Sequence, residues 1–115
     1  MDDLLDLDTI EMLKDMDDDD DPGFFSELVD TFAESAAETL VKLDAAVKAA
    51  DANMVREYAH NIKGSSANIG AAKMSSIAKA IENQARTGSL DGLEERVAEL
   101  RALFPASRAA LDSYR

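Results

Sequence analysis

The stretch that decides the fold is "PGFFSELVDTFAESAAETLVKLDAAVKAA", which runs from Pro22 to Ala50. No glycine or proline follows Gly23 in this stretch, and its apolar residues recur at steps of three and four, as in an amphipathic helix. The pattern predicts one long helix over residues 22–50, with Asp21 as N-cap and Pro22 at its first position. The apolar residues are Phe25, Leu28, Val29, Phe32, Ala36, Leu40, Leu43 and Val47.

Upstream of this helix lie the five consecutive aspartates Asp17 to Asp21. Such a run repels itself and is typical of a solvated loop. Metal binding is the alternative, but the run lacks the spaced ligands and the glycine of a calcium-binding loop. Before the run, "LDLDTIEMLKDM" predicts a short helix over about residues 8–16.

Downstream, three further helical patterns follow with short connections. Asp51 is expected to cap the first, which ends at Gly70, and Gly88 is expected to end the second. Asp91 is expected to cap the last, in which Pro105 should cause a kink or an interruption. Short connections between long amphipathic helices favour antiparallel neighbours.

We therefore predict an all-α fold, an up-and-down antiparallel four-helix bundle with a short additional N-terminal helix. The 115 residues are expected to form a single domain. Residues 1–21 would supply the short acidic helix and the Asp-rich loop, and residues 22–115 the bundle.

The net charge of −12 argues against binding to nucleic acid or to anionic membrane surfaces, because both require basic surfaces. The chain has no cysteine, no basic N-terminal signal and no long apolar run, so we expect a soluble, cytoplasmic protein. Residues 52–90 depart from the acidic average, with five basic and two acidic side chains.

The single histidine, His60, lies in this basic stretch. On a helical wheel it falls about 140° from Val55, which is at the centre of the apolar stripe, so the ring should point away from the core. Its neighbours one turn away are Arg56, Glu57, Lys63 and Gly64.

These neighbours suit phosphoryl transfer. A neutral imidazole is a competent nucleophile near neutral pH, Lys63 would stabilise an attached phosphoryl group, and Gly64 would leave room for a partner. The alternative, left open by spacing alone, is an ordinary surface histidine. A metal site has little support, because the chain has one histidine and no cysteine.

The motif "HNIKGSSANIGA", residues 60–71, resembles the signature of histidine-containing phosphotransfer (HPt) domains. The stretch "DPGFFSELVDTFAESAAETLVKLDAAV" is similar to the long second helix of that family, and "AADANMVREYAHNIKG" to its usual lead-in. The resemblance extends from about Leu5 to Leu111.

The resemblance implies a helical bundle whose exposed His60 is phosphorylated on Nε2. It also implies a phosphocarrier without kinase activity of its own, in a multistep phosphorelay. The implied partners are receiver domains of response regulators and a sensor histidine kinase. Magnesium would belong to the receiver alone, with no cofactor on this chain, and a monomer would suit such a shuttle.

If the roles of the family's motif residues apply at the matching positions here, Lys63 would neutralise the phosphoryl group and Gly64 would give a partner access to it. Ser65 and Ser66 would allow close packing. Some family members have a glutamine near the phosphohistidine. This chain has Glu82 at that position, so the role of this residue stays open.

Docking of partners is expected around the histidine. The candidates are Arg56 and Ala67 on the same helix and Ile10 and Leu13 on the N-terminal helix. The apolar candidates could equally cover the core.

Two other functions remain as alternatives. One is a helical adaptor that binds receiver-like partners without carrying phosphate. The other is a phosphoacceptor domain excised from a chemotaxis-type kinase, which the initial methionine and the compact C-terminal end disfavour.

Overall fold

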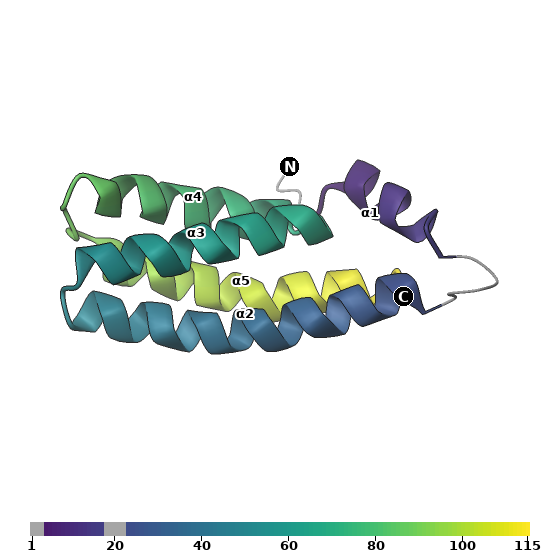
Figure 1. Cartoon of the computed structure of the whole chain (residues 1–115), viewed down its shortest axis with the longest axis horizontal. Helices are drawn as coiled ribbons and strands as arrows, with labels where there is room; N and C mark the ends of the chain where they lie inside the picture. Colours follow the sequence, from purple (N-terminus) through teal and green to yellow (C-terminus); the bar gives the residue numbers. More distant parts are fainter. Residues whose placement is uncertain (1–3, 18–22) are drawn as a thin grey trace.

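The computed structural model describes residues 4–17 and 23–115, and within them it contains five helices and no strand (Figure 1). The helices are α1 (Leu7–Lys14), α2 (Phe24–Lys48), α3 (Ala52–Ile69), α4 (Ala72–Arg86) and α5 (Leu93–Asp112). None of them is long and apolar enough to span a membrane.

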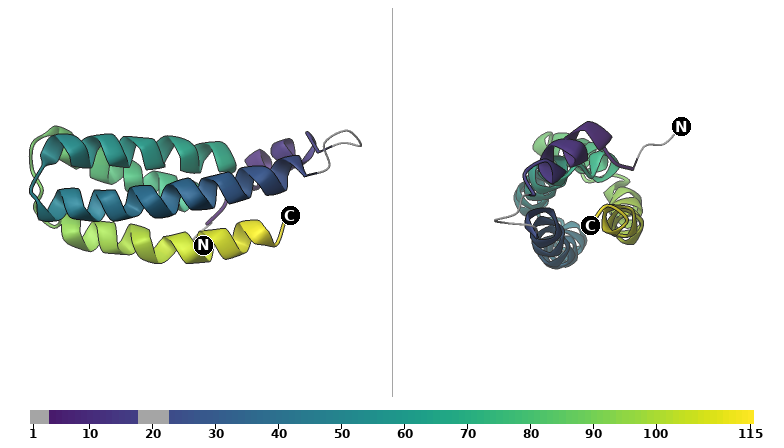
Figure 2. Two further views of the ribbon diagram at one scale, coloured as in Figure 1. Left: turned by 60° about the horizontal axis from the view of Figure 1, so that its bottom comes forward. Right: turned by 90° about the vertical axis from the view of Figure 1, so that its right-hand side faces the viewer.

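Helices α2 to α5 run up and down and form the bundle, whereas α1 packs across one end (Figures 1 and 2). The α2–α3 and α4–α5 connections lie at the opposite end of the bundle from α1, and the α3–α4 turn lies beside α1 (Figure 1). The predicted four-helix bundle with a short N-terminal helix is therefore confirmed.

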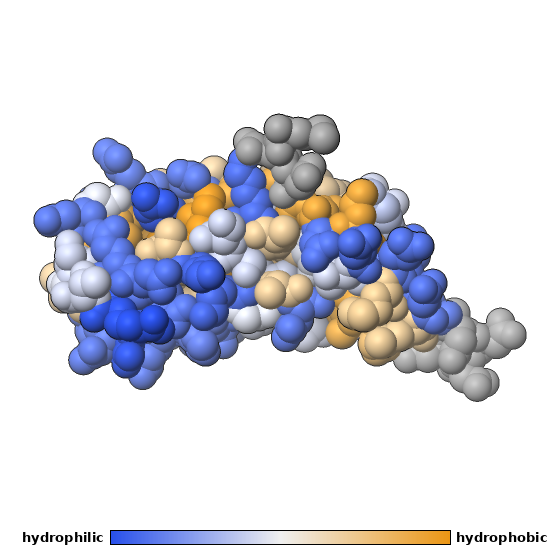
Figure 3. Space-filling model, turned by 90° about the horizontal axis from the view of Figure 1, so that it is seen from above, coloured by the Kyte–Doolittle hydropathy of each residue, from blue (hydrophilic) through white to orange (hydrophobic). Residues whose placement is uncertain are grey.

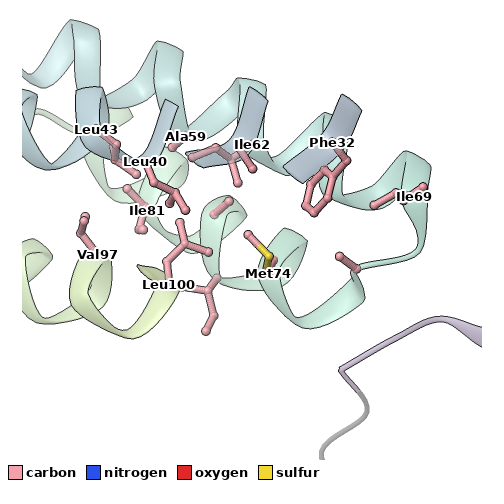
Figure 4. Close-up of a cluster of buried hydrophobic side chains, with 14 of the residues drawn as sticks. Phe32, Leu40, Leu43, Ala59, Ile62, Ile69, Met74, Ile81, Val97 and Leu100 are labelled. Carbon is pink, nitrogen blue, oxygen red and sulfur yellow. The ribbon is translucent and has the colours of Figure 1, made fainter. Parts of the chain in front are cut away.

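The apolar stripes predicted from the sequence meet along the axis of the bundle (Figure 4). Leu43 of α2, Ile62 of α3, Ile81 of α4 and Leu100 of α5 are almost completely buried. Each large side chain of this kind contributes about 1.5–3 kcal/mol on burial. The core therefore fixes which face of α3 is turned to solvent, and with it the direction of His60.

Two predicted helix ends are confirmed. The Asp51 carboxylate accepts a hydrogen bond from the backbone N–H of Met54 at 3.2 Å, as an N-cap does. Gly70 ends α3 in the left-handed conformation, with φ of 85°. A Cβ atom at Gly70 would lie 3.0 Å from Ile10 Cγ1 and 3.2 Å from the Asp6 carbonyl oxygen, so only glycine fits where α1 meets the α3–α4 turn.

Other predicted helix ends were wrong. α2 begins at Phe24 with Gly23 at the N-cap, and Asp21, Pro22 and most of the aspartate run lie outside the described residues. The last helix begins at Leu93 after Gly92, not after a cap from Asp91.

Pro105 does not interrupt the last helix, because α5 continues through it from Leu93 to Asp112. A proline has no backbone N–H, so the helix lacks the bond from residue 105 to the Arg101 carbonyl, and the proline ring also crowds that carbonyl. Packing against the bundle compensates for that loss: Leu100 and Leu111, on either side of the proline, are fully buried.

Candidate functional site

His60 lies near the middle of α3, and its side chain is 67% exposed. Its neighbours Ala59 and Ile62 are fully buried, so the core holds this part of α3 while the imidazole points outward. The predicted outward orientation of the ring is confirmed. Exposure on a rigid helix is what a group needs if it must react with another protein.

The ring is held from α4 by a buried carboxylate. Nδ1 of His60 lies 2.8 Å from Oε2 of Glu82, whose side chain is only 3% exposed. An ionised carboxylate has no proton to donate, so Nδ1 must carry the hydrogen and donate it to Glu82. In a neutral ring this leaves the lone pair on Nε2, the nitrogen away from Glu82. Nε2 is therefore the ring nitrogen with a lone pair available to act as a nucleophile.

Glu82 also contacts two cations. Lys63 Nζ lies 2.6 Å from Oε1, and Arg86 Nη2 lies 3.1 Å from Oε2. Burial raises the pKa of Glu82, but the hydrogen bonds and positive charge supplied by Lys63 and His60 outweigh burial and hold the pKa below the usual glutamate value. The carboxylate is therefore ionised at neutral pH, as the tautomer argument requires.

Lys63 thus points at Glu82 in this structure. A second contact fixes the same turn of α3, because the Ser75 hydroxyl donates to the Lys63 carbonyl oxygen at 2.9 Å. Ser66 is fully buried, which agrees with the packing role predicted for it, and Ser65 is half-buried. A Cβ atom at Gly64 would meet no atom within 4 Å, so the surface beside the ring is open.

An open pocket of about 280 Å³ lies beside the ring. It is lined by Arg56 and Glu57 from α3, by His60 itself, and by Glu82 and Arg86 from α4. Arg56, predicted as a docking residue, is exposed and shares this pocket with the histidine.

Of the remaining docking candidates, two are buried and one is exposed. Ile10 and Leu13 are 2% and 8% exposed and belong to the core, so they cover the core and cannot present a docking surface. Ala67 is exposed and lines a separate groove with Asp6 and Lys79.

Apolar surface is present at the α1 end of the molecule, but on other residues. Leu7 and Met12 of α1, and Met16 just after it, are more than half exposed. On the face formed by α3 and α4, apolar residues are more continuous toward α1, and hydrophilic residues dominate the opposite end (Figure 3).

Arg86 is the site residue that the sequence analysis did not single out, and the role of Glu82 beside the histidine was left open there. The available signal was the position of Glu82 on the α4 wheel, about 40° from Ala78 and so at the edge of the apolar stripe. A carboxylate placed there is half directed into the core and needs a cationic partner. Its partners are on α3, and no pattern within α4 could name them.

Comparisons with known proteins agree with this geometry. The Hpt domain model matches residues 27–110, and the chain belongs to that family. Among solved structures, histidine-containing phosphotransfer protein B from Pseudomonas aeruginosa PAO1 superposes with a TM-score of 0.86 and 30% identity, covering 96% of this chain and 92% of that one.

Two characterised relatives are also similar. Multistep phosphorelay regulator 1 of Schizosaccharomyces pombe is 34% identical over 92% of this chain, which spans only 36% of that protein's length. Histidine-containing phosphotransfer protein 4 of Arabidopsis thaliana is 28% identical over 89% of this chain and 82% of its own length.

Proposed function

We propose that this chain is a phosphocarrier that receives a phosphoryl group on Nε2 of His60 and passes it to another protein in a multistep phosphorelay. The observation that carries the proposal is the exposed imidazole whose Nδ1 is held at 2.8 Å by the buried, ionised Glu82. This arrangement gives an accessible ring nitrogen with a free lone pair, which a phosphoryl donor on another protein can reach. Family membership supports the same role.

The transfer step needs no proton to move. The Nε2 lone pair attacks the phosphorus of an aspartyl phosphate, and the bond from phosphorus to the carboxylate oxygen breaks as that carboxylate leaves with its electron pair. The imidazole keeps its Nδ1 hydrogen and becomes formally positive, and Glu82 stabilises that charge. Because the protein enters and leaves the step with the same proton, the reaction can run in either direction without a proton transfer.

Receiver domains and a sensor histidine kinase are the partners we propose. A receiver would cover the region of His60 and the open surface at Gly64, and the exposed Leu7 and Met12 would extend the contact. We assign magnesium to the receiver alone. The monomeric state and the cytoplasmic location stay predictions.

The test is phosphotransfer between the purified protein and a panel of receiver domains charged with labelled phosphate. We expect acid-labile, alkali-stable label to appear on this chain, as phosphohistidine does, and to be absent from His60→Gln. Circular dichroism would establish that the variant folds. Label that persists in His60→Gln, or no transfer with any receiver in the panel, would refute the proposal.

A further inference from the structure

The cations around His60 divide into two groups. Lys63 Nζ lies against Glu82 Oε1 at 2.6 Å, and Lys63 does not line the pocket beside the ring. Arg56 and Arg86 do line that pocket, from α3 and α4 respectively. The sequence predicted Lys63 as the partner of the phosphoryl group, so the geometry raises the question of which cation holds it.

The direction of the ring answers this question. A side chain on a helix leans toward the N-terminus and covers the preceding turn, which in α3 carries Arg56 and Glu57. The residue one turn back lies about 6 Å away between Cβ atoms. Since Nδ1 is turned to Glu82, Nε2 and any group on it lie on the other side of the exposed ring, and the ring itself lines the pocket.

The two arginines can bind an anion there. The Arg86 side chain is 58% exposed and gives one nitrogen to Glu82 Oε2, at 3.1 Å. A guanidinium has five N–H donors in a planar fork, so this single contact leaves others for phosphate oxygens. Arg56 is exposed, and within residues 4–17 and 23–115 no carboxylate forms an ion pair with it, so its guanidinium could bind a phosphoryl group bidentately.

We infer that Arg56 and Arg86 hold the phosphoryl group of phosphorylated His60, and that Lys63 serves as a positioning residue for Glu82. The inference rests on the proposed function, because it concerns the phosphorylated form of the same histidine. It assigns to Arg56 a role in binding the phosphoryl group rather than in partner docking.

Glu57 lines the same pocket and carries the opposite charge. The carboxylate of Glu57 repels a phosphoryl group, whereas the two arginines attract it. The negative charge of Glu82 is neutralised by its ion pair with Lys63. The pocket therefore contains the charged groups that act on the phosphoryl from both helices, and each can be varied separately.

The experiment phosphorylates the protein chemically with phosphoramidate, so that no partner protein is needed. The ionisation of the phosphoryl group is followed by ³¹P NMR across a pH titration, and ring resonances report the imidazole separately. We expect Arg56→Gln and Arg86→Gln each to raise the phosphoryl pKa by about half a unit, because each removes a cation that favours the dianion. Glu57→Gln should lower it.

Arg108→Gln is the matched control, because it removes one exposed arginine of α5 that is absent from the pocket. It should leave the titration unchanged. If both pocket arginine variants titrate like Arg108→Gln, the inference is wrong. Failure of phosphorylated wild-type protein to pass its phosphoryl group to any receiver would instead refute the proposed function, so the two failures are distinguishable.

Discussion

Replacing Glu82 by glutamine tests the central contact of the site, because it keeps the shape and the acceptor oxygen but removes the charge. A hydrogen bond to a charged group contributes about 1.5–3 kcal/mol, against about 0.5–1.5 kcal/mol for a neutral one. His60 is 67% exposed, so solvent reduces the difference and we take about 1 kcal/mol. The ring gains positive charge in the transition state, so the variant should lose about 1 kcal/mol of transition-state stabilisation. Transfer to His60 should then slow about fivefold.

The assay is the rate of label transfer from a charged receiver under single-turnover conditions. Glu57→Gln is the matched control, since Glu57 is another glutamate of the same pocket but does not contact Nδ1. We expect Glu57→Gln to transfer at or above the wild-type rate. Equal rates for wild type and Glu82→Gln would refute the role given to the carboxylate.

The ionised Glu82 should also make the stability of the protein depend on pH, and the Glu82→Gln variant tests this. The pKa of Glu82 is lower in the folded protein than in the unfolded chain, so its contribution is fully present above the unfolded pKa and is lost as the pH falls through the folded value. Wild-type protein should therefore exceed Glu82→Gln in free energy of unfolding at pH 7, by only about 1–2 kcal/mol, because the two cations that contact Glu82, Lys63 and Arg86, both reach solvent. Urea denaturation should show this gap closing in acid; a gap that widens below pH 4.5 would contradict the assignment.

Three further changes have definite expected outcomes. Gly64→Ala should raise the unfolding free energy by about 1 kcal/mol, because the added Cβ meets open space on a helix, and thermal melts check this. The bulkier Gly64→Gln should slow phosphotransfer, which the transfer assay measures. Pro105→Ala should restore the bond to the Arg101 carbonyl and raise stability by about 2 kcal/mol in urea denaturation, and a loss would mean that α5 needs the proline. Ala50→Gly should add about 1 kcal/mol, because Ala50 has a φ of 55°, and an unchanged melting temperature would count against strain there.

Much of the fold could be predicted because the relevant signals are local. Steps of three and four place residues such as Leu43 and Ile62 in the core, and the same wheel places His60 outside it. Caps such as Asp51 and Gly70 depend on a few neighbouring residues, and both are confirmed. The outward direction of the His60 side chain was thus available from the sequence.

The rest depends on contacts between helices. The interaction of Glu82 with Lys63 and His60 joins α4 to α3 across about twenty residues of sequence. Helical periodicity within either segment does not predict such a contact. Ile10 and Leu13 were ambiguous for the same reason, because one short helix has two faces and only the bundle end decides which is buried.

The exposed imidazole on α3 limits how the protein can operate. Any protein whose reacting group reaches Nε2 occupies the space above that one ring, so donor and acceptor exclude each other and no ternary complex can relay the phosphoryl directly. Each partner must dissociate before the next arrives. If the proposed function holds, an unphosphorylated receiver in excess should therefore inhibit loading by occupying the ring, and dissociation rates should govern the throughput of the relay as much as the chemistry does.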